Sequence, residues 1–466
     1  MPTSNEVSQS SSPSLQTRDT PKGTRKSLSR LSSVSLTPRA ALAAAAVFHL
    51  VVTVGVFCIG RFGLDPQQIN LSGIGQFARD GYRFERDTEL LAHTLVHDGL
   101  VAWLASPLQI HIKFYSLSFL LLGRLIGSNI LVAEPVNLFC YLVILATTFK
   151  LTRRLSGQGA AWVASAIVAL WPTLLLHTTQ FLRDPTLIAA ILILVLAATD
   201  LLTVDSNWSR NLIAGVIGWG ACLVLWMSRP DMWLVIRAIV VFAFVLVIIR
   251  MVRDRKLLVG NLTAFALLIV LTGFMPQVAQ QTKENTGLSL GGSANGEGLP
   301  IAARIAARRL DFVKSGLGQS GSMIDGDVSF KSDVDIIKYV PRAVEIGCFA
   351  PFPTMWFNPG YNVGLMGRLL SGVETVVSYV IALLACIFVW QNRRRLDVWL
   401  LVLTIMTGVM ALGLVVVNVG TLYRMRYPFW ILMVVLGAPV ITRWISRKSA
   451  SMVTASVTDD VAEASS

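Results

Sequence analysis

Clusters of lysine and arginine follow the apolar stretches of this chain at regular places. Four such clusters come directly after apolar runs of about twenty residues, the length that crosses a bilayer core. They lie at residues 150–154, 250–256, 393–395 and 443–448. Because cytoplasmic loops accumulate lysine and arginine, these clusters predict one common side of a membrane. The loops between alternate pairs of spans then lie on the outer side, where we look for function.

The composition agrees with a multi-span membrane protein. Of the 466 residues, 54% are hydrophobic and only 14% are charged, and the mean hydropathy is +0.62. These values are too apolar for a soluble domain. The net charge of +13 gathers at span ends, which favours membrane orientation and anionic lipid, and not nucleic acid, as its partner.

Hydropathy predicts ten transmembrane helices and therefore an all-α polytopic fold. The apolar runs that we interpret as spans lie near residues 41–61, 130–149, 159–178, 186–203, 212–228, 232–250, 257–275, 372–391, 398–417 and 427–445. A further apolar stretch, residues 108–127, would invert every later basic cluster if it crossed the membrane. We therefore expect it to lie along the interface, with His111, Lys113 and Arg124 reaching the head groups.

The polar segments divide the chain into five parts. Residues 1–39 are rich in serine, threonine, proline and basic residues, a composition that predicts a disordered cytoplasmic tail. The other parts are a membrane core at 40–275 with its first outer loop at 62–128, a large periplasmic loop at 276–370, the last membrane helices at 371–446, and a second cytoplasmic tail at 447–466. The large loop contains a Gly-rich stretch, 287–298, and an amphipathic basic segment, 301–314.

Acidic residues at two outer turns are candidates for chemistry. Asp65 follows the first span, and Arg183 and Asp184 lie between the third and fourth spans. An acid just beyond a span lies at the depth of a lipid phosphate. An arginine beside an aspartate can bind a phosphate with one side chain and a metal or hydroxyl with the other. Helix capping also explains both acids, because each is followed by proline.

Arginines on the outer face suggest an anionic partner. Arg424 and Arg426 begin the last span on the side where few cations are expected, so we expect them to bind a lipid phosphate. Snorkelling to the head groups is the alternative. Arg237 and Glu374 lie within the sixth and eighth spans, where ionisable groups face a cavity or one another. A structural ion pair would explain both.

The order of elements in the first half of the chain resembles the type C glycosyltransferases, which include protein mannosyltransferases and the lipid A aminoarabinose transferase. The resemblance covers residues 41–205 best. The matching order is a first span, the outer acid Asp65, interfacial segments ending at Gly127, a span, the basic turn 152–157, an Ala-rich span ending in Trp171-Pro172, and Leu182-Arg183-Asp184. Each element is degenerate alone, and the succession carries the resemblance.

The resemblance implies roles for particular residues. In such enzymes the first outer loop supplies a catalytic carboxylate, and the acid after the third span helps to bind metal or acceptor, which points to Asp65 and Asp184. Many relatives have an acidic pair where this chain has Asp65-Pro66, which leaves Asp80 and Asp87 as substitutes. The arginines proposed to hold a lipid phosphate are Arg183, Arg237, Arg424 and Arg426.

We therefore interpret the chain as an inverting glycosyltransferase of the bacterial inner membrane with a periplasmic active site. It would move a sugar from a polyprenyl-phosphate donor to a lipid-linked glycan, polysaccharide or lipid. Such a donor needs no nucleotide, and the sequence has no Gly-rich phosphate loop; a divalent metal, if used, would bind Asp65 and Asp184. The alternatives are a non-catalytic flippase or scaffold of exopolysaccharide export, and a polymerase of lipid-linked repeat units. A carrier has no chemical need for the Asp65 carboxylate.

Overall fold

The computed structural model describes residues 37–203, 208–286, 300–316, 323–357 and 363–465. The regular elements of these residues are helices, and the β-type contacts are two isolated bridges. The chain divides into two compact units, Met1–Ala41 and Leu42–Ser466. Most of the expected amino-terminal tail and the whole Gly-rich stretch 287–298 lie outside the described residues.

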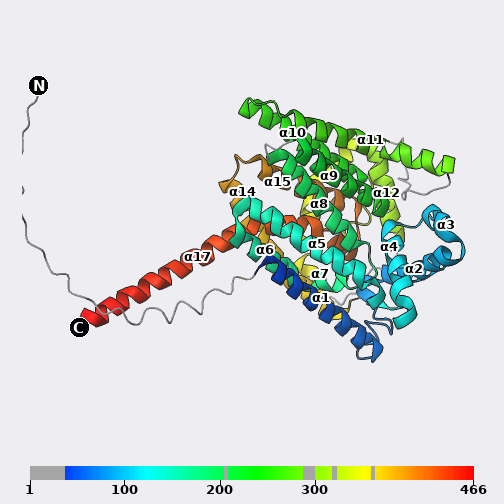
Figure 1. The fold of residues 1–466 in the computed structure, drawn as a ribbon, viewed down its shortest axis with the longest axis horizontal. Helices are drawn as coiled ribbons and strands as arrows, with labels where there is room; N and C mark the ends of the chain where they lie inside the picture. Colours follow the sequence, from blue (N-terminus) through cyan, green and yellow to red (C-terminus); the bar gives the residue numbers. More distant parts are fainter. Residues whose placement is uncertain (1–36, 204–207, 287–299, 317–322, 358–362, 466) are drawn as a thin grey trace, which may run out of the picture. The chain divides into compact units, whose positions relative to one another are not determined.

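Nine helices of the described part are long and apolar enough to cross a membrane, which confirms the all-α polytopic fold (Figure 1). They are α1 (Pro38–Arg61), α5 (Ile130–Ser156), α8 (Asp184–Thr203), α9 (Trp208–Ser228), α10 (Trp233–Asp254), α11 (Val259–Thr286), α14 (Gly364–Gln391), α15 (Leu396–Val415) and α17 (Tyr427–Ser465). The most buried span is α8, which packs against α5, α9, α10, α15 and α17. The first residue of this central helix is Asp184.

The predicted third span is a bent pair of helices. Residues 159–178 were expected to form one helix, but α6 (Gln158–Ala169) and α7 (Pro172–Thr178) meet at 64°. The residue before a proline is disfavoured in the helical region, and Trp171 has an extended backbone. The described residues contain the expected ten spans only if this bent pair counts as one span.

The ambiguous stretch forms α4 (Ile110–Ile126), which is not among the candidate spans. The expectation that its basic side chains reach the head groups is wrong for His111 and Lys113, which are 0% and 2% exposed. The Lys113 ammonium donates to the Leu104 carbonyl at 2.8 Å. The reason is that α4 packs between α5 and α2 (Asp80–His97). Arg124 alone is exposed, as expected.

The basic clusters meet at one end of the helix bundle. Arg253 donates to the carbonyl of Arg394 at 3.4 Å, and Arg395 donates to the carbonyl of Leu155 at 2.8 Å. Arg443 donates to the side chain of the last residue of α14 at 2.7 Å. Clusters far apart in the sequence thus share one end, which we call the basic end.

Two helices of the large outer loop pack on the bundle. The amphipathic segment forms α12 (Ile301–Gly316), and α13 (Asp333–Phe349) follows it. A Cβ atom on Gly413 of α15 would lie 1.9 Å from the Ala343 carbonyl oxygen, and one on Gly347 of α13 would lie 2.1 Å from that of Val409. These glycines let the backbones of α13 and α15 approach closely, so this part of the loop is integral to the fold.

The remaining elements are short. They are η1 (Gln76–Ala78), α3 (Gly99–Ala105), η2 (Pro230–Met232), η3 (Pro353–Met355) and α16 (Val419–Met425). Two of them carry charged residues of the outer turns. The first is η2, before α10, which contains Asp231, and the second is α16, before α17, which contains Arg424.

Candidate functional site

Asp184 lies at the centre of a charged cluster. Its side chain is buried, and its two carboxylate oxygens each lie 3.6 Å from an arginine: Oδ1 from Nη2 of Arg229, and Oδ2 from Nη1 of Arg424. Neither oxygen accepts a hydrogen bond from the described residues. The arginines therefore neutralise Asp184 by charge without binding it directly, and Nε of Arg229 and Nη1 of Arg424 make no hydrogen bond with the described residues.

Asp80 joins the first outer loop to this cluster. It begins α2, and its Oδ2 accepts a hydrogen bond from Nη2 of Arg424 at 2.9 Å. The Asp80 side chain is 51% exposed, whereas that of Arg424 is 11% exposed. Burial raises the pKa of Asp80, but the charge and hydrogen bond of Arg424 outweigh it and lower the pKa below its usual range. Asp80 therefore stays ionised at neutral pH.

Positive charge exceeds negative charge in the cluster. Besides Arg229 and Arg424, Arg183 acts by its charge on Asp80, so three arginines accompany the two carboxylates Asp80 and Asp184. A third carboxylate, Asp231, also acts on Arg229 by its charge, but it is paired with Arg308. Burial, followed by the charge of Arg183, lowers the pKa of Arg229, although Asp184 and Asp231 oppose this shift. The positive charge of Arg229 is thus costly, and a further anion would relieve that cost. We call the three arginines, Asp80 and Asp184 the arginine cluster.

Packed turns bring the arginine cluster together. Asp184 begins α8, Arg229 lies between α9 and η2, and Arg424 lies on α16. The first outer loop is fastened to the turn before α8 by Gln180, whose Oε1 accepts from the backbone N–H of Gly75 at 2.9 Å. Loop and turns therefore meet at the end of the bundle opposite the basic end.

A buried hydrogen-bond network lies beside the cluster. Glu374 of α14 accepts from the backbone N–H of Thr173 at 2.9 Å and from the hydroxyl of Tyr423. The Tyr427 hydroxyl donates to Oγ1 of Thr173 at 2.8 Å, and Nδ1 of His177 lies 3.1 Å from the same hydroxyl. This network holds α16 against α7 and α14. It also accounts for Glu374 without the ion pair considered from the sequence.

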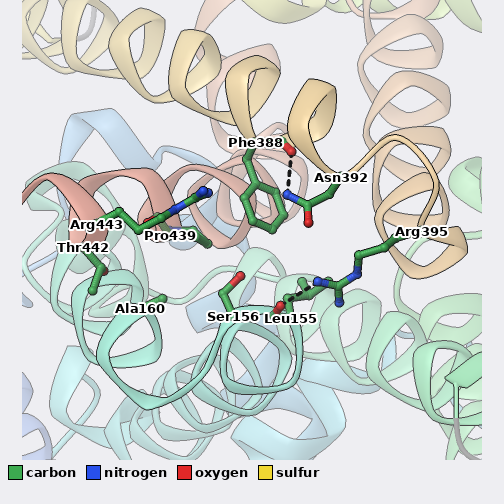
Figure 2. Close-up of a pocket in the computed structure, with 9 residues that line it drawn as sticks. All are labelled: Leu155, Ser156, Ala160, Phe388, Asn392, Arg395, Pro439, Thr442 and Arg443. Atoms are coloured by element: carbon green, nitrogen blue, oxygen red, sulfur yellow. Dashed lines mark hydrogen bonds between the residues drawn. The ribbon is translucent and has the colours of Figure 1, made fainter.

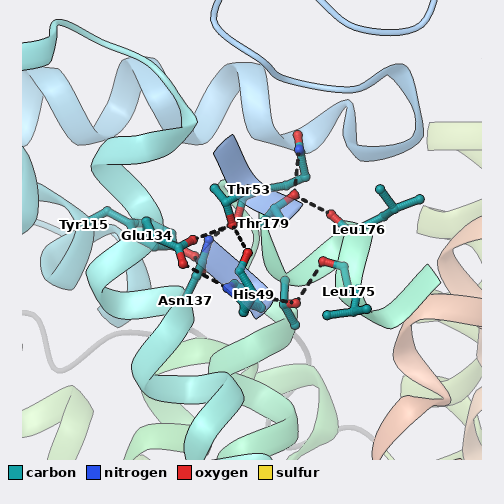
Figure 3. Close-up of polar contacts among 10 residues, drawn as sticks. His49, Thr53, Tyr115, Glu134, Asn137, Leu175, Leu176 and Thr179 are labelled. Carbon is teal, nitrogen blue, oxygen red and sulfur yellow. Dashed lines mark hydrogen bonds and ion pairs between the residues drawn. The ribbon is translucent and has the colours of Figure 1, made fainter. Parts of the chain in front are cut away.

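A second buried network ties α1 and α5 to α7. Figure 3 shows His49 and Glu134 pointing toward one another, with Nδ1 2.9 Å from Oε1. Thr53 donates to Glu134 at 2.8 Å, and Nε2 of His49 lies 3.0 Å from the Thr178 hydroxyl. Sequence reasoning missed Glu134 because it lies inside a long apolar run; the polar Asn137 one turn later was the available signal. These contacts hold α1, α5 and α7 together.

Four of the predicted site residues lie apart from the cluster, namely Asp65, Asp87, Arg237 and Arg426. Asp65 is exposed in the turn after α1, and its carboxylate makes no hydrogen bond or ion pair with the described residues. Asp87 lies on α2, 3.4 Å from Arg83. Arg237 is exposed on α10. The cluster contains Asp80, Asp184, Arg183 and Arg424 of the predicted set and adds Arg229, which the sequence marks as a charged residue at an outer turn.

Arg426 has a different environment from its neighbour Arg424. Its side chain is 4% exposed, and Nη1 donates to the carbonyls of Cys348 at 3.0 Å and Ala350 at 2.6 Å. The guanidinium also lies over the Tyr423 ring. Arg426 therefore fastens the end of α13 to the start of α17.

The arrangement does not fit a divalent metal held by Asp65 and Asp184. Arginines flank Asp184 on both sides, and two guanidinium charges at this distance oppose a cation. In the described part of the chain, no group of three or more His, Cys, Asp or Glu residues could hold a metal ion. The cluster is instead suited to an anion.

No protein-family model matches the sequence, and no curated protein matches it. Among solved structures, the chain is similar to a crystal structure of ArnT from Cupriavidus metallidurans bound to undecaprenyl phosphate. The two share 12% identity and a TM-score of 0.35, over 86% of this chain and 78% of that one. The likeness is distant, so the function has to be inferred from the residues of this chain.

Proposed function

We propose that this protein is a glycosyltransferase that takes a sugar from a polyprenyl-phosphate donor and passes it to a hydroxyl of a glycan, polysaccharide or lipid. The observation that carries the proposal is the arginine cluster, with three arginines and two carboxylates at the end of the bundle opposite the basic end. By the positive-inside rule, that end faces the periplasm. A polyprenyl donor reaches such a site from the bilayer.

The donor phosphate binds between Arg229 and Arg424. A guanidinium pairs with two phosphate oxygens at once, and both side chains are held near Asp184 at 3.6 Å without a direct hydrogen bond to it. The phosphate also balances the excess charge that Arg183 adds. Asp184, which is buried, acts as a positioning residue for the two arginines.

The reaction is a single displacement at the anomeric carbon. The acceptor hydroxyl oxygen forms a bond to that carbon as the bond from the carbon to the phosphate oxygen breaks, which inverts its configuration. The hydroxyl proton passes to a carboxylate. Polyprenyl phosphate leaves with one more negative charge, and the arginines stabilise the charge as it develops.

Asp80 is the carboxylate best placed to receive the proton. Arg424 binds its Oδ2, and the side chain is half exposed, so Oδ1 can meet an acceptor arriving from solvent. A base whose pKa is lowered is weaker, but it is fully ionised when the acceptor binds. Asp65, in the same outer loop, remains the alternative.

The direct test is turnover by the purified protein of a panel of polyprenyl-phosphate sugars, measured as released polyprenyl phosphate. We expect the wild type to release it from at least one donor. We expect Asp80→Asn to lose roughly a hundredfold or more of the rate and still bind undecaprenyl phosphate. A wild type that binds undecaprenyl phosphate but turns over no donor, with any acceptor extract, would favour the flippase or scaffold.

A further inference from the structure

A cavity of about 240 Å³ lies at the basic end, away from the arginine cluster. The ends of α5 and α14, the start of α6 and the middle of α17 form its wall. Figure 2 shows Arg443 and Arg395 entering from opposite sides, with Ser156 between them. Phe388 of α14 and Asn392, which follows that helix, complete one wall, and Ala160 of α6 completes another. The cavity therefore combines cations with neutral polar groups.

Arg443 supplies unbalanced positive charge to this cavity. It donates to Oε1 of Gln391 at 2.7 Å and to the Pro439 carbonyl at 3.2 Å, but it has no ion pair with a carboxylate among the described residues. Arg395, in contrast, is paired with Asp397 at 2.6 Å. An anion in the cavity would be the charged partner that Arg443 lacks.

The cavity lies at the depth of lipid head groups. Trp390 and Trp444, which adjoin the lining in sequence, are 72% and 66% exposed. Exposed tryptophans gather where a bilayer meets water, and the arginine clusters around them favour an anionic leaflet. The occupant is thus within reach of a membrane lipid.

An apolar stripe runs along the exposed face of α14 and ends at Trp390, next to Gln391, which accepts the hydrogen bond from Arg443. Its exposed side chains follow one another at spacings of four, three, four and three residues, which places them on one helix face. They are Val376, Val380, Leu383, Ile387 and Trp390. A free phosphate ion would make no use of this stripe, whereas the acyl chain of a phospholipid would lie along it. This favours a lipid as the source of the anion.

We propose that this cavity binds the phosphate of an anionic phospholipid of the adjacent leaflet, with Arg443 as its main ligand and the acyl chains along α14. The proposal is independent of the glycosyltransferase reaction. Because α5, α6, α14 and α17 all contribute to the wall, the bound head group joins four helices at one point. The lipid should therefore stabilise the folded protein.

The first test is retention of phospholipid by purified protein, measured by native mass spectrometry. We expect the wild type to retain phosphatidylglycerol and Arg443→Gln to retain about fivefold less, as loss of one basic contact at a membrane surface implies. Arg447→Gln is the matched control, because Arg447 is exposed one turn later on the same helix and does not line the cavity. Equal loss in both variants would show diffuse attraction and overturn the site.

A second variant tests whether the lipid needs the volume of the cavity as well as the charge of Arg443. Ala160→Phe fills the cavity without changing any charge, and we expect it to release the lipid as Arg443→Gln does. Titration of delipidated wild type with phosphatidylglycerol should raise Tm, whereas phosphatidylcholine or inorganic phosphate should not. Retention of the lipid by Ala160→Phe, or equal stabilisation by inorganic phosphate, would contradict the proposal.

Discussion

The guanidinium of Arg424 donates a 2.9 Å hydrogen bond to the carboxylate of Asp80, 344 positions earlier in the sequence. The same side chain lies 3.6 Å from Asp184. Arg424 therefore joins the first outer loop, the central span α8 and the turn before the last span. The candidate site depends on this convergence. Substitutions inside the arginine cluster should therefore have effects that the same substitutions outside it do not have.

The same substitution, aspartate to asparagine, at each of the two candidate bases shows which one accepts the proton. Asp80→Asn removes a carboxylate that touches the arginine cluster, and Asp65→Asn removes one that is exposed and unpaired with described residues. We expect the first to reduce transfer by roughly a hundredfold or more and the second to leave it within about twofold. Initial rates of polyprenyl phosphate release measure both. The reverse pattern would make Asp65 the base, as the sequence suggests.

The Asp80 contact should make stability depend on pH. Arg424 lowers the folded-state pKa of Asp80 below its ordinary value of 3.8, so its stabilisation is present above that value and is lost as the pH falls through the folded-state pKa. The effect is small, because the carboxylate is half exposed and screened by salt. Thermal unfolding in detergent should show a wild-type advantage over Asp80→Asn near neutral pH that disappears in acid below about pH 4. An advantage that persists unchanged in acid would mean that the charge of Asp80 does not cause it.

Arg426 should matter for stability. Its guanidinium donates to the carbonyls of Cys348 and Ala350, and removal of a buried charged donor costs about 1.5–3 kcal/mol. We expect Arg426→Gln to lower the free energy of unfolding by that amount and to expose the segment around α13 to protease. Undecaprenyl phosphate binding by the folded variant should be unchanged. Normal stability with lost binding would instead support the phosphate-binding role expected from the sequence.

The crossing of α13 and α15 should tolerate no side chain at Gly413. A Cβ atom there would lie 1.9 Å from the backbone carbonyl oxygen of Ala343, so Gly413→Ala must separate the helices and should destabilise the protein by about 1–3 kcal/mol. Gly220→Ala is the control, because nothing lies within 4 Å of its added Cβ; it should be neutral or stabilising in a helix. Equal unfolding midpoints for both variants would contradict the close approach.

Hydropathy was sufficient to predict most of the fold. Except for the third, each apolar run of about twenty residues forms one long helix, because backbone groups in lipid must be satisfied within the segment. The third run differs because Pro172 interrupts the helix while the apolar pattern continues across it. Hydropathy also could not reveal that α4 buries Lys113, because that depends on which helices pack around it.

The site was less predictable, because it is made by contacts between distant segments. Arg424 and Arg426 are two residues apart, which puts them on nearly opposite sides of a helical turn, and the sequence does not say which side faces Asp184. Likewise, closeness to the first span favoured Asp65, whereas folding of the outer loop against Gln180 brings Asp80 to the cluster. Charged residues at outer turns indicated where the site lies. Which of them come into contact could not be predicted from the neighbouring sequence.

The central claim is that the arginine cluster binds a lipid phosphate, and the most direct measurement is the Kd for undecaprenyl phosphate. Arg229→Gln and Arg424→Gln each remove a guanidinium from the cluster, and Arg237→Gln makes the same change on the exposed face of α10. For folded, monodisperse protein we predict that each cluster variant raises Kd by about tenfold or more and that Arg237→Gln leaves it unchanged. Equal Kd values for the wild type and both cluster variants, or weakening in Arg237→Gln alone, would contradict the account.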